Sequence, residues 1–191
     1  TAHSAPVDQI PLLRGKVAAV RQRAALPPGG HLAKTLDHIL ATYPRDDLFQ
    51  IGDDDLYEAV MGILAAGERQ RLRLFVWRDP YERFISCLIY VPREAYSTEL
   101  RLNFQAILMQ AFAGMRADFE VALTDTILAR VHLTIRTQAG QVPPYDVHAL
   151  EASLAAAARR WATSPTSSPW RKSRVPPHPW ACPTARTPIS A

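Results

Sequence analysis

Three consecutive carboxylates, Asp53, Asp54 and Asp55, are the first candidate for chemistry in the sequence. They stand directly before an apolar set at helical spacing, Leu56, Val60, Ile63 and Leu64. At the start of a helix, carboxylates accept hydrogen bonds from the free N–H groups and oppose the helix dipole. Carboxylate oxygens also bind Ca²⁺ or Mg²⁺. Because no neighbouring His, Asp or Glu set completes a coordination shell, the sequence favours the helix start over a metal site.

The histidines are scattered rather than clustered, at His3, His31, His38, His132, His148 and His178. His31 and His38 share one face of an expected helix, but a separation of seven residues is too long for both to hold one metal ion. His132 alternates with apolar neighbours, so it points to the less apolar face of a strand. A solvent-side or supporting role is favoured there over catalysis.

Two charged pairs could bind a ligand. Arg71 and Arg73 lie on one strand face and could receive a carboxylate, although a solvated or helix-facing strand edge is the favoured interpretation. Glu82 and Arg83 stand at the tip of an expected hairpin, where they mark either a binding loop or an ordinary polar turn. None of these residues is predicted to be catalytic, and no cofactor-binding or metal-binding residue is predicted.

Glycine spacing excludes several enzyme classes. None of the eight glycines forms a G-x-G pair, and neither G-x-x-x-x-G-K-[ST] nor G-x-S-x-G occurs. The sequence therefore has no dinucleotide fingerprint, no phosphate loop and no nucleophile elbow. The two cysteines, Cys87 and Cys182, form neither a disulfide framework nor a zinc pattern, which favours a reducing, cytoplasmic compartment.

Composition places the chain among globular proteins. It has 191 residues, of which 48% are hydrophobic and 21% charged. The net charge of +4 is accounted for by four basic residues near the C-terminus, Arg171, Lys172, Arg174 and Arg186. The remainder is formally neutral, so we expect no nucleic-acid partner. No apolar run reaches membrane-spanning length and no signal peptide precedes the fold. The missing initiator Met indicates that the chain begins inside a longer protein.

Periodicity predicts the elements that position these residues. Period-two alternation predicts four strands, and spacing of three and four residues predicts helices, with Ser97 or Thr98 and Asp146 as N-caps and Gly114 as a C-cap. The helices are expected over 10–26, 31–43, from 53 onward, 98–114 and 145–161. The strands are expected over 71–77, 84–91, 119–125 and 129–137.

This order predicts an α+β fold, with a four-stranded, largely antiparallel sheet of ββαββα order, packed helices and a preceding helical segment. The strand at 84–91 is apolar on both faces and is expected at the centre of the sheet. The strands beginning at Phe119 and Ala129 are each expected to bury one face, with Phe119, Val121 and Leu123 inward in the first. We predict a helical linker at 1–67, an α+β domain at 68–162 and a disordered tail at 163–191.

The tail carries seven of the sixteen prolines and shows no periodicity. One interpretation is a proline-rich ligand segment. The other is translation in a shifted frame, because a GC-rich gene read out of frame yields Pro, Arg, Ser, Thr and Ala.

One family resemblance covers residues 11–161. It is carried by YPRDDLFQI, by GERQRLRLFVWRDPYERFISCLIYVPREAYSTELR, and by LARVHLTIRT with a following YDV. These segments resemble the large bacterial NAD-specific glutamate dehydrogenases, in the N-terminal regulatory half that contains ACT-like domains. The tail departs from the family, so the resemblance implies a truncated or frameshifted fragment. An ACT domain is βαββαβ, and moving its first strand to the end gives αββαββ, which relates this order to it by a circular shift.

The resemblance implies a function for the parent enzyme: oxidation of L-glutamate with NAD to 2-oxoglutarate, ammonia and NADH. It implies no catalytic residue and no cofactor in this chain. The expected role is a regulatory or assembly module whose partners are the rest of the dehydrogenase and a homo-oligomer formed through it, with an amino acid as a candidate effector. The alternative is a free-standing amino-acid-binding module or a purely structural oligomerisation module.

Overall fold

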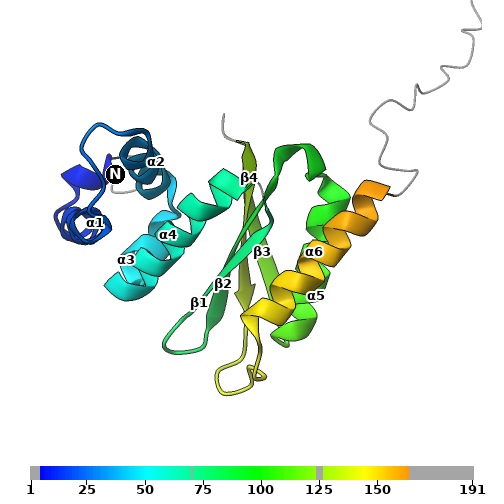
Figure 1. Cartoon of the computed structure of the whole chain (residues 1–191). Helices are drawn as coiled ribbons and strands as arrows, with labels where there is room; N and C mark the ends of the chain where they lie inside the picture. Colours follow the sequence, from blue (N-terminus) through cyan, green and yellow to red (C-terminus); the bar gives the residue numbers. More distant parts are fainter. Residues whose placement is uncertain (1–4, 70, 124–126, 164–191) are drawn as a thin grey trace, which may run out of the picture.

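The computed structural model describes residues 5–69, 71–123 and 127–163, which form three layers (Figure 1). Helices α1 to α4 form the first layer, a four-stranded sheet the second, and helices α5 and α6 the third. The arrangement is the predicted α+β fold, a ββαββα unit preceded by a helical segment.

The helical segment opens with the short 3-10 helix η1. Its elements are η1 (Val7–Gln9), α1 (Pro11–Ala24), α2 (His31–Thr42), α3 (Arg45–Gln50) and α4 (Asp53–Arg69). Helix α3 was not predicted, because its 6 residues are too few to show a helical apolar period. Pro44 precedes α3 and, as its N-cap residue, separates it from α2.

The sheet has the order β1-β2-β4-β3, and each neighbouring pair is antiparallel. Its strands are β1 (Arg73–Arg78), β2 (Phe84–Pro92), β3 (Arg116–Ala122) and β4 (Leu128–Arg136). Strand β2 is central, as its two apolar faces predicted. The 3-10 helix η2 (Arg93–Ala95) leads from β2 to α5 (Thr98–Ala111), and α6 (Val147–Thr163) follows β4.

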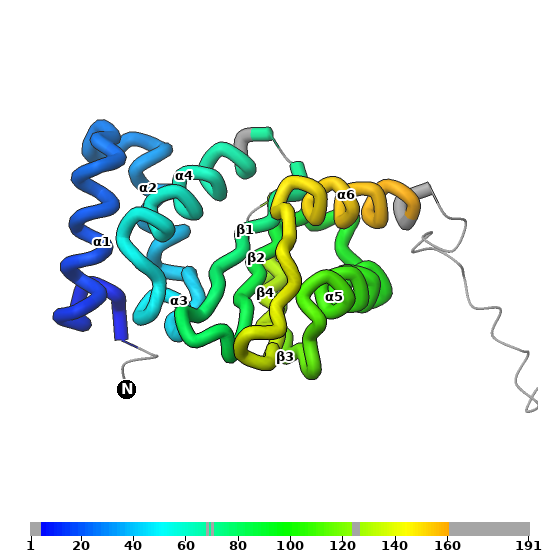
Figure 2. Tube along the Cα trace, turned by 90° about the horizontal axis from the view of Figure 1, so that it is seen from below, coloured from blue at the N-terminus to red at the C-terminus, as the bar shows by residue number. Residues whose placement is uncertain are grey.

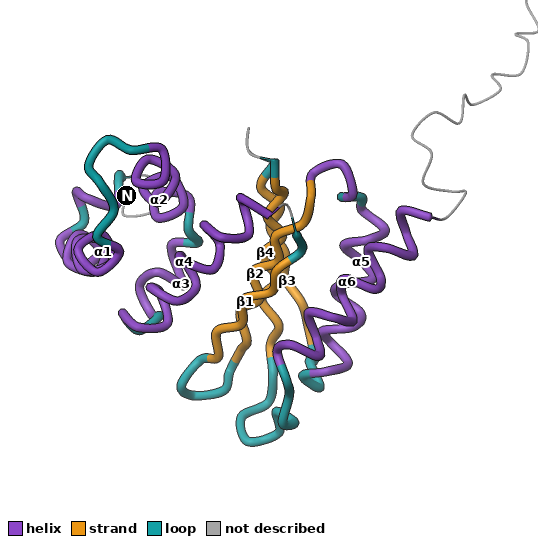
Figure 3. The backbone as a smooth tube through the Cα atoms, viewed as in Figure 1, coloured by secondary structure: helices purple, strands orange, loops and turns teal. Residues whose placement is uncertain are grey.

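Helices α5 and α6 lie side by side on one face of the sheet (Figures 2 and 3). Strand β2, helix α5 and strand β3 form a βαβ unit into which β4 is inserted. Moving the first strand and helix of βαββαβ to the end gives ββαββα. The circular shift is therefore one element further along than the sequence suggested, since the helix that accompanies α5 is α6 rather than a helix before β1.

Each face of the sheet has its own core, because successive side chains of a strand point to opposite faces. Leu88 and the partly buried Phe75, Trp77 and Tyr90 pack against the helical segment. Cys87, together with Leu74, Ile85, Ile89 and Val91, packs against α5 and α6. The helical segment thus covers one face of the sheet.

Strand β3 differs from the expectation of one buried face. Phe119 is 55% exposed and Leu123 is 52% exposed, while Val121 is only partly buried. The reason is the position of β3 at the sheet edge. On the face of the sheet that α5 and α6 cover, α5 contacts β3, whereas α6 contacts β1 at the other edge. The alternation identified the strand but not how far the helices extend over it.

Two predicted helix caps are confirmed and one is wrong. The Ser97 Oγ accepts a hydrogen bond from the Leu100 N–H at 3.1 Å, and an Asp146 Oδ1 accepts one from the His148 N–H at 2.9 Å. Helix α5 ends at Ala111, before the predicted C-cap Gly114, and the left-handed residue is Ala113. Gly114 instead permits a close approach, since a Cβ there would collide with Ile135 Cγ2.

Gly114→Ala should lower the free energy of unfolding by about 1–3 kcal/mol, because the added methyl group overpacks the core against the stiff, buried Ile135. Gly15→Ala, in the middle of α1, is the matched control, because an added Cβ would meet no described atom within 4 Å. It should raise stability by about 0.5–1 kcal/mol, since alanine favours a helix interior. Urea unfolding measures both, and an unchanged midpoint for Gly114→Ala would contradict the overpacking.

Candidate functional site

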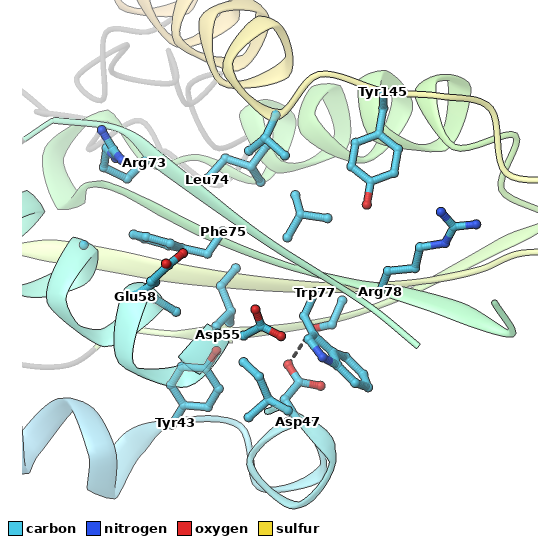
Figure 4. A pocket seen from close by; sticks show the side chains of 17 residues that line it. Tyr43, Asp47, Asp55, Glu58, Arg73, Leu74, Phe75, Trp77, Arg78 and Tyr145 are labelled. Atoms are coloured by element: carbon cyan, nitrogen blue, oxygen red, sulfur yellow. Dashed lines mark hydrogen bonds between the residues drawn. The ribbon is translucent and has the colours of Figure 1, made fainter. Parts of the chain in front are cut away.

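A groove runs along the edge strand β1, between the helical segment and the start of α6 (Figure 4). Its volume of about 480 Å³ is in the range of small-molecule sites. We call it the β1 groove. Its lining includes Tyr43, Asp47, Asp55, Glu58, Gly62, Arg73, Phe75, Trp77, Arg78, Ser86 and Tyr145. Gly62 brings α4 close to the strand, since a Cβ there would lie 2.5 Å from the Phe75 ring.

The backbone of β1 contributes polar groups to the groove. Within the described sheet, strand β1 pairs only with β2, so every second residue turns its N–H and C=O outward. The outward N–H of Leu74 donates to a Glu151 carboxylate oxygen at 2.9 Å. By the same alternation, Val76 and Arg78 turn their backbone groups toward the groove. The groove therefore offers hydrogen-bond donors and acceptors in the pattern of a strand edge.

Charges of opposite sign stand along the groove. The exposed carboxylates Asp55 and Glu58 come from α4, and the guanidinium groups of Arg73 and Arg78 come from β1. Arg73 is the member of the predicted Arg71–Arg73 pair that meets a carboxylate, with its Nε 3.4 Å from Glu151. Positive and negative groups beside a free strand edge can together hold the carboxylate and ammonium groups of an amino acid.

The charged side chains at the hairpin tip pair with neighbouring residues of the chain. Arg83 forms a two-point ion pair with the buried Asp79, at 2.9 and 3.0 Å, and this pairing lowers the pKa of the Asp79 carboxyl. Glu82 pairs with Arg78 and accepts a hydrogen bond from the Gly140 N–H at 2.7 Å. Both candidate residues of the predicted binding loop therefore have internal partners, which supports the ordinary-turn interpretation.

A buried polar cluster joins α3 to the sheet at the floor of the groove. The Ser86 hydroxyl lies 2.5 Å from Asp47 Oδ2 and 2.9 Å from His132 Nε2, and Asp47 Oδ2 lies 3.3 Å from the same ring nitrogen. The His132 side chain is 12% exposed. The solvent-side position considered for His132 is wrong, because the helical segment covers that face. Its contacts with Ser86 and Asp47 are those of a side chain that supports the cluster.

These three residue types also make up serine hydrolase triads, but the geometry differs. In a triad, the aspartate bonds one ring nitrogen and the serine the other. Here Asp47 and Ser86 both approach Nε2, and Ser86 is only 2% exposed. The cluster therefore positions α3 and provides no accessible nucleophile.

Burial also raises the pKa of other groups around β2. It raises the pKa of the Tyr43 hydroxyl, and the charge of Asp47 adds to that shift. It raises the pKa of Tyr90 to about 12, against the opposing effect of Arg130. Burial raises the pKa of the Cys87 thiol above its ordinary value, so this cysteine is not a thiolate nucleophile at neutral pH.

The other sequence candidates lie apart from the groove or only at its rim. Asp53, Asp54 and Asp55 occupy the first turn of α4, as the helix-start interpretation predicted. His31 and His38 are exposed and line a second pocket beside α2. Among the residues that the structure describes, no group of three potential ligands could hold a metal ion, and no helix is long and apolar enough to cross a membrane.

Sequence reasoning missed Asp47 and Ser86. Asp47 stands in YPRDDLFQI, beside other charged residues that gave no hint of burial. Ser86 is a polar residue inside an otherwise apolar strand, and that interruption is a signal that could have been used. A buried hydroxyl needs a partner, and its partner comes from a helix that periodicity did not show.

Two family models match the chain along these structural layers. A model described as glutamate dehydrogenase, helical motif 1, matches residues 10–69. A second, described as glutamate dehydrogenase, ACT2 domain, matches residues 73–162.

Curated relatives agree with these models. NAD-specific glutamate dehydrogenases of Halomonas elongata and Pseudomonas aeruginosa are 40% and 38% identical over 161 residues, and that of Mycobacterium tuberculosis is 29% identical over 173 residues. Each match covers 84% of this chain. The chain belongs to the NAD-specific glutamate dehydrogenase family. It spans about a tenth of the length of these relatives, 10–11%.

Helices α1 to α4 lie within the residues that match helical motif 1 of glutamate dehydrogenase, and the chain from β1 to residue 162 of α6 matches its ACT2 domain. The predicted domain limits of 1–67, 68–162 and 163–191 remain a prediction. The predicted disorder and both interpretations of the tail concern residues 164–191, which lie outside the described part, as does Cys182. The β1 groove and the buried cluster lie between the two matched segments.

Asp47→Ala and Ser86→Ala should each lower the free energy of unfolding by about 1–3 kcal/mol, because each removes one hydrogen-bonding partner from a buried three-residue cluster. A double-mutant cycle measured by urea unfolding should give a coupling energy of about 0.5–3 kcal/mol. The exposed pair Arg116–Asp118 is the control, with an expected coupling of about 0.2–1 kcal/mol. Additive losses at Asp47 and Ser86 would show that their bond does not hold α3 on the sheet.

Proposed function

We propose that this chain is a regulatory and assembly module of an NAD-dependent glutamate dehydrogenase. The parent reaction is oxidation of L-glutamate with NAD to 2-oxoglutarate, ammonia and NADH, catalysed by other parts of that enzyme. NAD is the cofactor of the parent, not of this chain. Its partners are the remainder of the dehydrogenase and the homo-oligomer formed through it.

The β1 groove is the observation that carries the regulatory part of this proposal. It combines two carboxylates, Asp55 and Glu58, with the guanidinium groups of Arg73 and Arg78 and the open edge of β1. These groups complement the ammonium, the carboxylate and the polar backbone atoms of an amino acid. An effector bound there contacts both matched segments, so it can change how they are held together.

Binding of a free amino acid should stabilise the 191-residue chain by about 2.7 kcal/mol at a hundredfold its dissociation constant, which corresponds to roughly 5–10 °C in Tm. A thermal-shift screen of the common amino acids measures this. Glu58→Gln should remove the shift, because it removes one acceptor for the ammonium group. Glu94→Gln, at an exposed acid of η2 outside the groove, should leave it unchanged.

Two results would contradict the proposal. If no amino acid in the screen raises the Tm, the chain does not bind an amino-acid effector. Glutamate-dependent NADH formation by the chain alone would show a catalytic site where the proposal has none.

The exposed apolar side chains around β3 favour the assembly role, and they also support the alternative of a purely structural oligomerisation module. Met115, Phe119, Leu123 and Ile127 are each more than half exposed, at 66%, 55%, 52% and 58%. They lie on an edge strand or directly beside it, and such apolar surface marks interaction sites.

The chain should therefore associate with itself in a concentration-dependent way through this edge. Phe119→Ser should weaken the association at least tenfold, since it removes an aromatic contact from the surface. Leu12→Ser is the matched control, because Leu12 is 61% exposed but lies on α1. Sedimentation equilibrium gives both constants. Equal effects of the two substitutions would place the contact elsewhere.

A further inference from the structure

A second pocket lies on the other side of the helical segment, between helices α2 and α4 and strands β2 and β4. Its volume is about 400 Å³. Apolar side chains from both segments form most of its wall, including Leu32, Ile39, Ile63, Leu64 and Leu128. We call it the Arg130 pocket, after the guanidinium group that lines it.

Arg130 is a largely buried cation whose hydrogen-bonding capacity is only partly used. Its side chain is 12% exposed. One Nη donates to the Thr42 carbonyl at the end of α2, and the group also bonds the Tyr90 hydroxyl. The carboxylate of Glu120 faces it and is 66% exposed. The distance from this carboxylate to Nη2, 3.6 Å, is too long for a hydrogen bond. The Arg130 Nε is buried and has no hydrogen-bond partner among the described residues.

The charge balance of the pocket favours an anion. No described residue that lines it is an aspartate or a glutamate, whereas Arg130 is a fixed cation and His31 and His38 add hydrogen-bonding rings at the rim. A carboxylate that met Nη2 would replace the loose contact to Glu120 with a charge-assisted hydrogen bond. Glu120 faces Arg130 from outside the described lining and is 66% exposed, and no residue of that lining offers a carboxylate to an ammonium group, so the pocket suits an amino acid less well than a monocarboxylate.

We infer that the Arg130 pocket binds an aliphatic monocarboxylate, with the carboxylate at Arg130 and the apolar chain against Ile39, Ile63 and Leu64. Such a ligand touches α2 and α4 on one side and β2 and β4 on the other. It would join the helical motif to the ACT2 domain at a further point, in addition to the Asp47–Ser86 and Arg130–Thr42 bonds. Occupancy would therefore hold the two matched segments together.

Octanoate and octan-1-ol are the matched probes, because they share the aliphatic chain and differ in charge. Titration calorimetry on the 191-residue chain should show octanoate binding at least tenfold tighter than octan-1-ol. Arg130→Gln should weaken the binding of octanoate at least tenfold and leave the affinity for octan-1-ol unchanged. Arg136→Gln is the control on the same strand, since Arg136 is 60% exposed and outside the pocket.

Because Arg130 supports the fold through Thr42, a second variant avoids it. Leu32 lines the pocket and is 38% exposed, so Leu32→Glu places a negative charge beside the carboxylate without disturbing buried groups. Leu32→Glu should weaken the binding of octanoate at least tenfold, whereas Leu12→Glu on α1 should leave it unchanged. Equal binding of octanoate and octan-1-ol, or octanoate binding that neither Arg130→Gln nor Leu32→Glu weakens, would overturn the inference. Glu58→Gln should leave octanoate affinity unchanged, which separates this site from the β1 groove.

Discussion

The sheet face beneath the helical segment carries polar groups that must find partners away from water, and the rest of the structure depends on this constraint. Ser86, His132 and Arg130 all point to that face. An unpaired buried polar group costs free energy comparable to a lost hydrogen bond or more. The helical segment supplies the partners, since Asp47 of α3 meets Ser86 and His132, and the end of α2 meets Arg130. These contacts fix where α3 and the end of α2 meet the sheet.

The same constraint explains why the two cavities lie where they do. Polar contacts hold α2 and α3 to the sheet at a few residues. The apolar packing of α4 fills only part of the space that remains between these helices and the sheet. On one side the gap opens along β1, where α4 presents Asp55 and Glu58. On the other it opens beside Arg130, where α2 and α4 present mainly apolar side chains. The one docking arrangement thus leaves two cavities, on which the two proposed ligands rest: a zwitterionic amino acid at the β1 groove and an amphipathic anion at the Arg130 pocket.

Most of the fold could be predicted from the sequence, because it depends on local patterns. The doubly apolar strand 84–91 indicated a central position, and Ser97 and Asp146 marked helix starts by side-chain chemistry that acts over two or three residues. The candidate site could not be predicted in the same way. Asp47 and Ser86 are 39 residues apart, and Thr42 and Arg130 are 88 apart. No periodicity reports which distant helix end will meet a strand.

The exposed edge strand β3 also shows that a local sequence pattern does not report which distant elements will cover a strand. Its alternation is a correct sign of a strand, yet alternation only sorts side chains between two faces and does not say whether a helix covers either one. Arg101 of α5 covers part of the Phe119 ring, at 3.7 Å from its centroid, and still leaves it more than half exposed. A central strand such as β2 must be covered on both faces for the fold to exist, whereas an edge strand can leave apolar surface for another chain. The apolar surface that folding leaves uncovered at β3 is therefore the surface on which the proposed assembly contact rests.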